Sequence, residues 1–555
     1  MRLGDPINLT LVALLGLLVT SGCNRQPSTP IANGASVDGA PDVINLEQGW
    51  SRETQDQAWF ISFGSRLVPY NWFLSLEQTD SVDLFRDEAH LTGFGFLAQQ
   101  PTDNNPDGLP VGFSQDHDDD AQAWLGLTCA ACHTGEVHYR GAKIRVDGGQ
   151  SLLDFDGFEA AVVDALSATL ANPDKFERFA RRVLLDNAEN PLALGDLRDA
   201  LVQRTQELAA RRRMNATEVA YGHGRLDAFG QIFNAAAAEF IHEPGNRRPP
   251  DAPVSYPVLW SAPHLDVVQW NGSAPNAGPG PLVQNVTTAL AVYGQIEVRP
   301  GDHSYASSVN FANLERLQNW IYTLKSPRWP AQVLGQLSDE QVARGQALYA
   351  ASCQSCHQIS NRDDAKRKLK ATLVPIAEIG TDARAAANFV NARSASGPLR
   401  GEKVAVLAGD HMAAETATIN LVVHAATGAL LEHPVAATRA AVKDYHSVYK
   451  ANIDTHPNYY KARPLDGIWS SAPYLHNGSV PTLYDLLLPP DDRPQQFFVG
   501  SRELDIVRVG LESGPGEGRS VFDTRLTGNG NDGHTYGTSL SAAERMDLIE
   551  FLKTL

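Results

Sequence analysis

Two copies of one five-residue motif carry the clearest chemical signal in the sequence. Cys129 to His133 and Cys353 to His357 both read Cys-x-x-Cys-His. This spacing is the attachment signature of a c-type haem: two thiols form thioethers with the porphyrin, and the adjacent histidine becomes an axial ligand of the iron. We therefore expect two covalently bound haem c groups. The expected haem-binding residues are Cys129, Cys132, His133, Cys353, Cys356 and His357.

The same cysteines could instead form a structural zinc site or a thiol redox pair. Two Cys-x-x-Cys pairs can close one zinc site, but such pairs usually lie much closer together in the sequence. Zinc also leaves the histidine after each pair unexplained. We therefore favour haem for both motifs.

Composition limits the classes of protein to which the chain can belong. Its 555 residues suggest two or three domains. A net charge of −18 makes nucleic acid and anionic lipid surfaces poor partners. Four of the five cysteines lie in the haem motifs, which leaves Cys23 without a partner for a disulfide. Because covalent haem is attached outside the cytoplasm, we expect an exported protein.

The N-terminus has the features of an export signal. Leu9 to Thr20 is an apolar run too short to span a bilayer and typical of a signal peptide. Thr20 to Cys23 resembles the cleavage box of bacterial lipoproteins, in which the cysteine is lipidated and becomes the mature N-terminus. We expect a signal peptide over residues 1–22 and a lipid-anchored linker over residues 23–45, with ordinary signal-peptide cleavage nearby as the alternative. The expected location is the periplasm, with a membrane tether through Cys23.

Helical patterns suggest that each half of the chain ends in a similar way. Apolar stripes predict one helix over 314–324 and another over 546–552. Ser338 to Gln341 is a capping box at the start of a helix that leads into the second haem motif. Gly345 in that helix would let it cross the C-terminal helix closely.

These patterns predict a mainly α-helical fold of two tandem cytochrome c-like haem domains with long loops. The first domain covers residues 46–332 and carries a helical insertion over 160–213, and the second covers residues 333–555. We also expect a short helix over 121–128 leading into the first haem motif, and a strand and turn over 144–149 after it.

Loop sequences repeat as well. Trp469 to Ser479 in the second half matches Trp260 to Leu265, followed by Trp270 to Ser273, in the first half. In this alignment Trp270 takes the place of His476.

The two haem motifs, the tandem repeat and the segment Ala472 to Ser479 together resemble the bacterial di-haem cytochrome c peroxidase superfamily. Within it, several stretches are similar to the rubber oxygenase A branch, and the resemblance covers most of residues 46–555. These stretches are Arg66–Phe73, Asn105–Phe113, Cys129–Thr134, Leu465–Leu487 and Gly528–His534.

The resemblance implies different tasks for the two haems. The haem held by His133 would keep an open position for dioxygen or hydrogen peroxide, and the haem held by His357 would be six-coordinate and serve electron transfer. Trp270 matches a tryptophan that lies between the haems in such enzymes, and the alternative is a loop tryptophan packed in a domain interface. The candidates for the second axial ligand of the His357 iron are, in order, His534, His476 and Met412.

The sequence also predicts which kind of side chain lines the wall above the first haem. Residues 271–296 contain no Asp, Glu or His, whereas peroxide cleavage requires an acid–base side chain above the iron. The position of the peroxidase glutamate falls near Ala289 and Leu290, and Gly148–Gly149 stand about where the peroxidases have a histidine. We therefore expect an apolar distal pocket with Leu290 in its wall, suited to dioxygen beside a hydrophobic organic substrate. His223, from a separate loop, is the alternative distal residue.

Other charged residues have weaker assignments. Arg66, Arg225 and Arg463 are candidates to pair with haem propionates, since buried carboxylates need guanidinium partners. Members of the superfamily can hold calcium between the domains. The acidic run Asp116–Asp120 lacks the spaced pattern of a calcium loop and indicates a solvated loop.

The leading hypothesis is a di-haem oxidoreductase that activates dioxygen, or peroxide, at the His133 haem. Two alternatives stay open. One is a cytochrome c peroxidase that takes electrons from a small periplasmic cytochrome. The other is an electron-transfer cytochrome in which both irons are six-coordinate and catalyse nothing.

Overall fold

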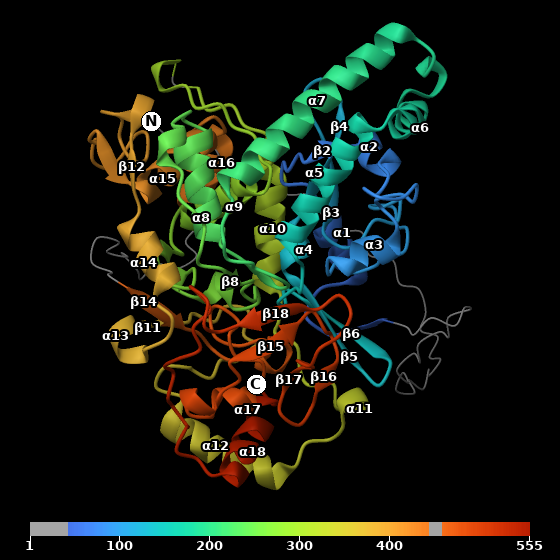
Figure 1. The fold of residues 1–555 in the computed structure, drawn as a ribbon. Coiled ribbons are helices and arrows are strands. Elements are labelled where there is room, and N and C mark those ends of the chain that lie inside the picture. Colours follow the sequence, from blue (N-terminus) through green and yellow to red (C-terminus); the bar gives the residue numbers. More distant parts are fainter. Residues whose placement is uncertain (1–42, 303, 443–457) are drawn as a thin grey trace, which may run out of the picture. The chain divides into compact units, whose positions relative to one another are not determined.

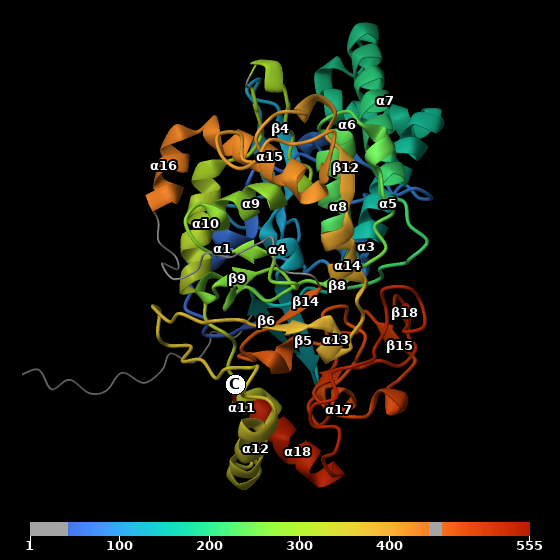
Figure 2. The ribbon, with the colours of Figure 1, turned by 90° about the vertical axis from the view of Figure 1, so that its left-hand side faces the viewer.

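A computed structural model describes residues 43–302, 304–442 and 458–555 (Figure 1; Figure 2). The expected signal peptide, Cys23 and nearly all of the expected linker lie outside these residues. The described residues combine helices with small sheets of two or three strands, so the expectation of a mainly α fold is wrong and the fold is mixed. No helix in this part of the chain is long and apolar enough to cross a membrane.

The first haem motif follows a strand, and not the short helix expected before it. β4 (Ala123–Leu127) lies between β2 (Val68–Pro69) and β3 (Phe113–His117) in an antiparallel sheet. Leu125, Gly126 and Leu127 are all buried, and β4 is paired along both of its edges. The motif itself forms the short helix α4 (Cys129–Cys132).

A second small sheet begins directly after the first motif. β5 (Thr134–Tyr139) and β6 (Ala142–Asp147) form an antiparallel hairpin, and β1 (Val43–Asn45) pairs with β6 in parallel. β6 confirms the strand expected over 144–149. This sheet therefore ties the start of the described chain to the first haem motif.

Three helices make up the insertion expected over 160–213. They are α5 (Phe155–Ala171), α6 (Pro173–Leu184) and α7 (Pro191–Met214), at the top of Figure 1. The predicted helices are confirmed, and their place as an insertion in a cytochrome c-like domain stays a prediction.

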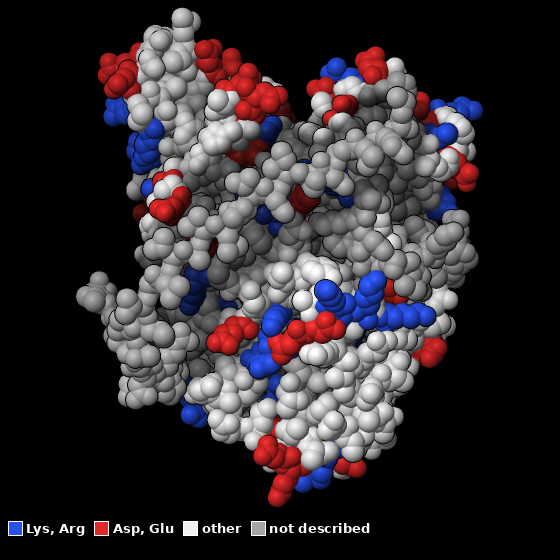
Figure 3. All heavy atoms as spheres, turned by 180° about the vertical axis from the view of Figure 1, so that it is seen from behind, with Lys and Arg blue, Asp and Glu red and all other residues white. Residues whose placement is uncertain are grey.

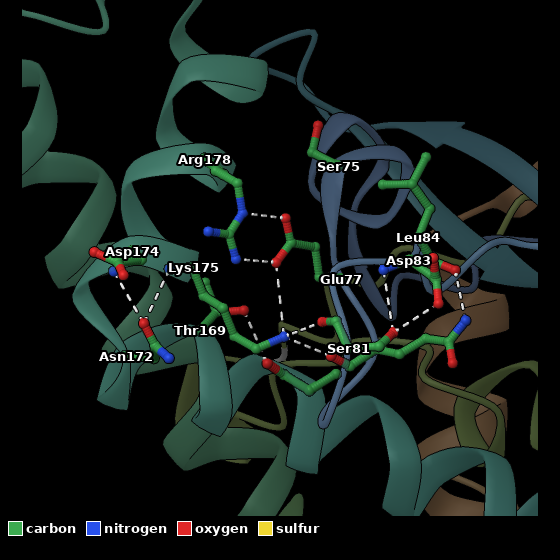
Figure 4. Close-up of polar contacts among 12 residues, drawn as sticks. Ser75, Glu77, Ser81, Asp83, Leu84, Thr169, Asn172, Asp174, Lys175 and Arg178 are labelled. Atoms are coloured by element: carbon green, nitrogen blue, oxygen red, sulfur yellow. Dashed lines mark hydrogen bonds and ion pairs between the residues drawn. The ribbon is translucent and has the colours of Figure 1, made fainter.

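Glu77 holds α6 to the preceding part of the chain. Its buried carboxylate accepts two hydrogen bonds from Arg178, at 2.7 and 2.8 Å (Figure 4). It accepts a third from Arg182 at 3.0 Å. Nζ of Lys175 lies 3.6 Å from the same carboxylate. The hydrogen bonds from Arg178 and Arg182 hold the pKa of Glu77 below its ordinary value. The insertion is therefore docked by charge as well as by apolar packing.

The C-terminal helix packs across the helix that leads into the second haem motif, as predicted. These are α18 (Ala542–Leu552) and α12 (Asp339–Ser352), at the bottom of Figure 1. A Cβ on Gly345 would lie 2.0 Å from the carbonyl O of Asp547, so the close approach requires glycine at this position. The second haem motif begins where α12 ends.

The two expected haem domains do not separate within the described part of the chain. The described residues between Val43 and Leu555 form one unit. α15 (Thr418–Leu431), from the second expected domain, shares an apolar core with α9 (Gly280–Ala291) from the first. The boundary near residue 332 stays an interpretation of the sequence repeat.

On the face shown in Figure 3, basic side chains lie beside acidic ones.

The remaining strands pair in antiparallel fashion. The other helices are α1 (Arg52–Phe60), α2 (Tyr70–Ser75), α3 (Glu88–Gly93), α8 (Ala228–Asn234), α10 (Phe311–Thr323), α11 (Ala331–Leu334), α13 (Ile376–Ile379), α14 (Arg384–Asn391), α16 (Pro434–Val442) and α17 (Leu483–Leu486). The other strand pairs are β7 (Arg225–Leu226) with β8 (Val254–Ser255), β9 (Val267–Val268) with β10 (Ala274–Pro275), β11 (Thr372–Pro375) with β14 (Tyr459–Ala462), β12 (Arg393–Ala395) with β13 (Glu415–Ala417), β15 (Gln496–Val499) with β18 (Ser520–Asp523), and β16 (Leu504–Asp505) with β17 (Gly510–Leu511).

Candidate haem sites

The first haem motif lies beside a cavity, with its histidine oriented by the backbone. Thr128 caps α4 by accepting a hydrogen bond from the backbone N–H of Ala130 at 3.2 Å. Nδ1 of His133 lies 2.8 Å from the carbonyl O of Pro257. Because a carbonyl can only accept, the proton is on Nδ1 and Nε2 is left to bind a metal. Burial lowers the pKa of His133 to about 4, so the imidazole is neutral, which is the form that ligates metals.

The second motif repeats this arrangement. Nδ1 of His357 donates to the carbonyl O of Arg463 at 2.8 Å, and burial lowers the pKa of the imidazole. The two motifs line two separate cavities, and all four motif cysteines are free thiols. These cysteines therefore do not come together in one zinc site.

His534 lies near His357 in the second cavity. The centroids of the two imidazole rings are 6.3 Å apart, which leaves room for one atom bound by both rings through bonds of about 2 Å each. Arg493 fixes the loop by donating to the carbonyl O atoms of Asn531, Gly533 and His534. The structure thus brings the first-ranked ligand candidate within reach of the iron that His357 would hold.

The two lower-ranked ligand candidates have other surroundings. His476 also lines the second cavity, but its ring stacks on Tyr460 with centroids 4.0 Å apart and meets Trp270 at 6.5 Å. Burial lowers the pKa of His476 to about 3. Met412 is buried in the same apolar core as Leu421 and lines neither cavity.

Trp270 stands between the two cavities and lines both of them. Its Nε1 donates to the carbonyl O of Ser255 at 3.0 Å. Lys461 and Arg463 also line both cavities. Trp270 and Arg463 are among the residues predicted from the sequence, and Lys461 is not. The available signal was its place two residues before Arg463, on the same side of an extended strand.

One wall of the first cavity differs from the prediction. Leu290 does not line this cavity, because its side chain is buried in an apolar core on another face of α9. The face of α9 that does line the cavity carries Gln284, Asn285 and Thr288, at the spacing of one side of a helix. Gln318 of α10 adds a further amide. This wall is polar where an apolar one was expected.

Of the three arginines suggested for haem propionates, only Arg463 lines the cavities. Arg66 forms an ion pair with Asp116 at 2.7 Å. Arg225 is buried and donates to Oδ1 of Asn529 at 2.8 Å. Both of these guanidinium groups therefore have protein partners away from the haem motifs.

His223 and the acidic run also make other contacts. Nδ1 of His223 lies 3.0 Å from Oγ of Ser520, and His223 lines neither cavity. Asp116, the first residue of the run, accepts from Arg66, and Asp118 accepts from Nε1 of Trp124 at 2.8 Å.

The residues around the two cavities fit a haem in each. Buried polar atoms without a hydrogen-bond partner in the described structure lie among the lining residues, and such atoms call for a polar ligand. They are Nη1 of Arg463, Nε2 of Gln150, Oγ1 of Thr381 and Nδ1 of His534 in the second cavity, and Oγ of Ser261 and Nε2 of Gln318 in the first.

Comparison with known proteins supports cytochrome c-like domains that bind haem c covalently. A family described as "RoxA-like, cytochrome c-like" matches residues 459–498, and the family "Cytochrome c" matches residues 342–416. Two relatives come from Sinorhizobium fredii. The chain is 26% identical to uncharacterized protein y4iM over 344 residues, which cover 58% of this chain and 69% of the relative. It is 30% identical to uncharacterized protein y4iJ over 572 residues, which cover 92% of this chain and 93% of the relative. The chain therefore belongs to the same family as y4iJ of Sinorhizobium fredii, and it carries cytochrome c-like haem domains.

Proposed function

We propose that this protein is a di-haem c-type oxidoreductase that activates dioxygen at the haem held by His133. The haem held by His357 is its electron partner. We also place the chain in the di-haem cytochrome c peroxidase superfamily, near the rubber oxygenase A branch, and the RoxA-like match over residues 459–498 supports this placement.

The observation that carries the proposal is the difference between the two cavities. His357 has a second imidazole, His534, at a ring separation of 6.3 Å. Among the described residues that line the first cavity, His133 is the only histidine and there is no methionine. An iron with two axial protein ligands suits electron transfer, whereas an iron with one free position can bind dioxygen.

The wall of the first cavity favours dioxygen over peroxide. The amides of Gln284 and Asn285 can donate hydrogen bonds to an oxygen ligand, whereas the hydroxyl of Thr288 already donates to the carbonyl O of Gln284 at 3.1 Å. The described lining contains no Asp or Glu, so no carboxyl group there can move a proton between two oxygen atoms, as peroxide cleavage requires. Apolar side chains such as Val268 and Ile321 complete the wall and suit a hydrophobic organic substrate.

The proposed location is the periplasm. Covalent haem attachment and the apolar run at the N-terminus support export, with residues 1–22 as the signal peptide and lipidated Cys23 as the tether. A small periplasmic cytochrome is the proposed source of electrons.

Electronic absorption and EPR spectra of the haem-loaded protein, with and without cyanide or carbon monoxide, test this function. We expect one high-spin haem that binds the ligand and one low-spin haem that does not. Oxygen consumption in the presence of hydrophobic organic compounds, compared with peroxide turnover, then separates an oxygenase from a peroxidase. Two low-spin haems that ignore both ligands, even after half-reduction, would refute catalysis and leave an electron carrier.

A further inference from the structure

Two cationic side chains lie in the wall between the haem cavities. Lys461 belongs to β14, and Arg463 follows two positions later, on the same side of the extended backbone. Together with Trp270, these two residues line both cavities. Their positive charges are therefore placed where ligands in either cavity can reach them.

Neither cation forms an ion pair within the described structure. Nζ of Lys461 lies 3.5 Å from the carbonyl O of Val267, which is a long contact. Nη1 of Arg463 is buried and has no hydrogen-bond partner. Asp266 and Asp466 act on the two cations only through longer-range electrostatics.

Both residues are half-buried along the cavity walls, and burial lowers the pKa of Lys461 to about 7 and that of Arg463 to about 10. An anion in this wall would therefore stabilise the charged form of both side chains. A haem carries two propionate carboxylates, and ammonium and guanidinium groups are their natural partners. We propose that Lys461 and Arg463 form one carboxylate-binding site that is shared by propionates of both haems. This inference rests on the two-haem function proposed above.

A shared site couples the two irons. A positive charge near an iron favours its reduced state, which carries one positive charge less. Because Lys461 borders both cavities, removal of its charge lowers the midpoint potentials of both haems. A lysine that served one haem would shift one potential alone.

Spectroelectrochemical titration of the haem-loaded protein tests this site. We expect Lys461→Met to lower both midpoint potentials and to shift the propionate bending bands of both haems in resonance Raman spectra. Lys461→Arg keeps the charge and should retain both potentials near the wild-type values. Lys366→Met, which changes an exposed lysine, is the matched control and should change neither.

A change confined to one haem, or no change in either, overturns the proposal. If Lys461→Met does not take up haem, Arg463→Lys replaces it, since the substitution keeps the charge but removes the two-pronged geometry of the guanidinium. The same Raman shift is then expected for both haems. Loss of oxygen turnover with both potentials shifted as expected would count against the proposed function and not against this site.

Discussion

Replacing Gly345 with alanine should force apart the two helices that hold the second haem motif. A Cβ at this position would lie 2.0 Å from the carbonyl O of Asp547, 2.7 Å from its carbonyl carbon and 2.8 Å from Cβ of Phe551. Favourable contacts between such atoms need roughly 3.5 Å. The two shortest contacts are with backbone atoms, so no change of rotamer relieves them. α18 must therefore shift by about 1 Å or more relative to α12.

Two opposing effects determine how much Gly345→Ala changes the free energy of unfolding. Alanine is favoured over glycine in a helix interior by about 1 kcal/mol. Overpacking of a helix contact costs about 1–3 kcal/mol, and the upper end applies when the backbone has to move. We expect Gly345→Ala to lower the free energy of unfolding by about 2 kcal/mol. Gly195 in α7 is the matched control: it is exposed and a Cβ there meets nothing within 4 Å, so Gly195→Ala should raise the same free energy by about 0.5–1 kcal/mol.

Urea denaturation of the haem-loaded proteins measures both effects. The electronic spectrum of the second haem reports the local consequence, because Cys353 and His357 follow α12 directly. We expect Gly345→Ala to lower the urea midpoint and to weaken the low-spin signal, and Gly195→Ala to do neither. A Gly345→Ala protein as stable as the wild type would refute the close crossing of α12 and α18.

Three further substitutions test the haem sites and the docking of the insertion. His534→Ala should open the second iron, so that the reduced protein binds two equivalents of carbon monoxide per chain instead of one, whereas His476→Ala should leave one; an unchanged count for the first variant would contradict axial ligation. Gln284→Ala should remove a hydrogen bond of about 1 kcal/mol and speed dioxygen release about fivefold in stopped-flow measurements, and an unchanged rate would exclude this amide from the ligand pocket. Glu77→Gln should lower the free energy of unfolding by about 1–2 kcal/mol at pH 7, while Glu177→Gln, in an exposed pair, should have little effect. The pKa of Glu77 is held below its ordinary value, so its contribution to the free energy of unfolding is present above the unfolded pKa of about 4.3 and is lost as the pH falls below that value. The variant and the wild type should therefore converge in stability at low pH. Equal stability of the two proteins already at pH 7 would contradict the docking role of Glu77.

Local chemistry explains which features could be predicted from the sequence. Thioether formation sets the spacing of each haem motif within one short turn, and Gly345 was recognisable because a close helix crossing needs a residue without a Cβ. The strand before the first motif is not recognisable from its local pattern because one of its two partner strands, β2, comes from a distant segment in which Val68 pairs with Leu125.

The lining of the first cavity was harder to predict because it depends on helix register. One position along an α-helix turns a side chain by about 100°, so an alignment error of one or two residues exchanges the core face of α9 for its cavity face. This is why Leu290 was placed in the wall and Gln284 was overlooked. The position of Lys461 between the two cavities cannot be read from the sequence. The cavities are built from distant segments of the chain, and they meet at the strand that carries this residue.

The two candidate haem sites share one local construction. In each, a backbone carbonyl from a segment more than a hundred residues after the motif accepts the Nδ1 proton of the haem histidine. Pro257 supplies it for His133, 124 residues later, and Arg463 supplies it for His357, 106 residues later. In both sites, the orientation of the haem histidine therefore depends on a loop, and the two loops correspond to each other in the sequence repeat.

The two sites differ in the residues that follow these carbonyl groups along the chain. Each half continues to a Trp-Ser pair whose indole, Trp260 or Trp469, is completely buried, so both loops are anchored in the same way. Beyond the anchor, the first half presents Trp270 and the second presents His476, and these two rings meet between the cavities at 6.5 Å. His534 comes from a still later loop that has no counterpart in the first half of the sequence alignment. A duplicated haem-binding unit can therefore give one site with two imidazoles and one with a single imidazole, because the second ligand lies outside the repeated part.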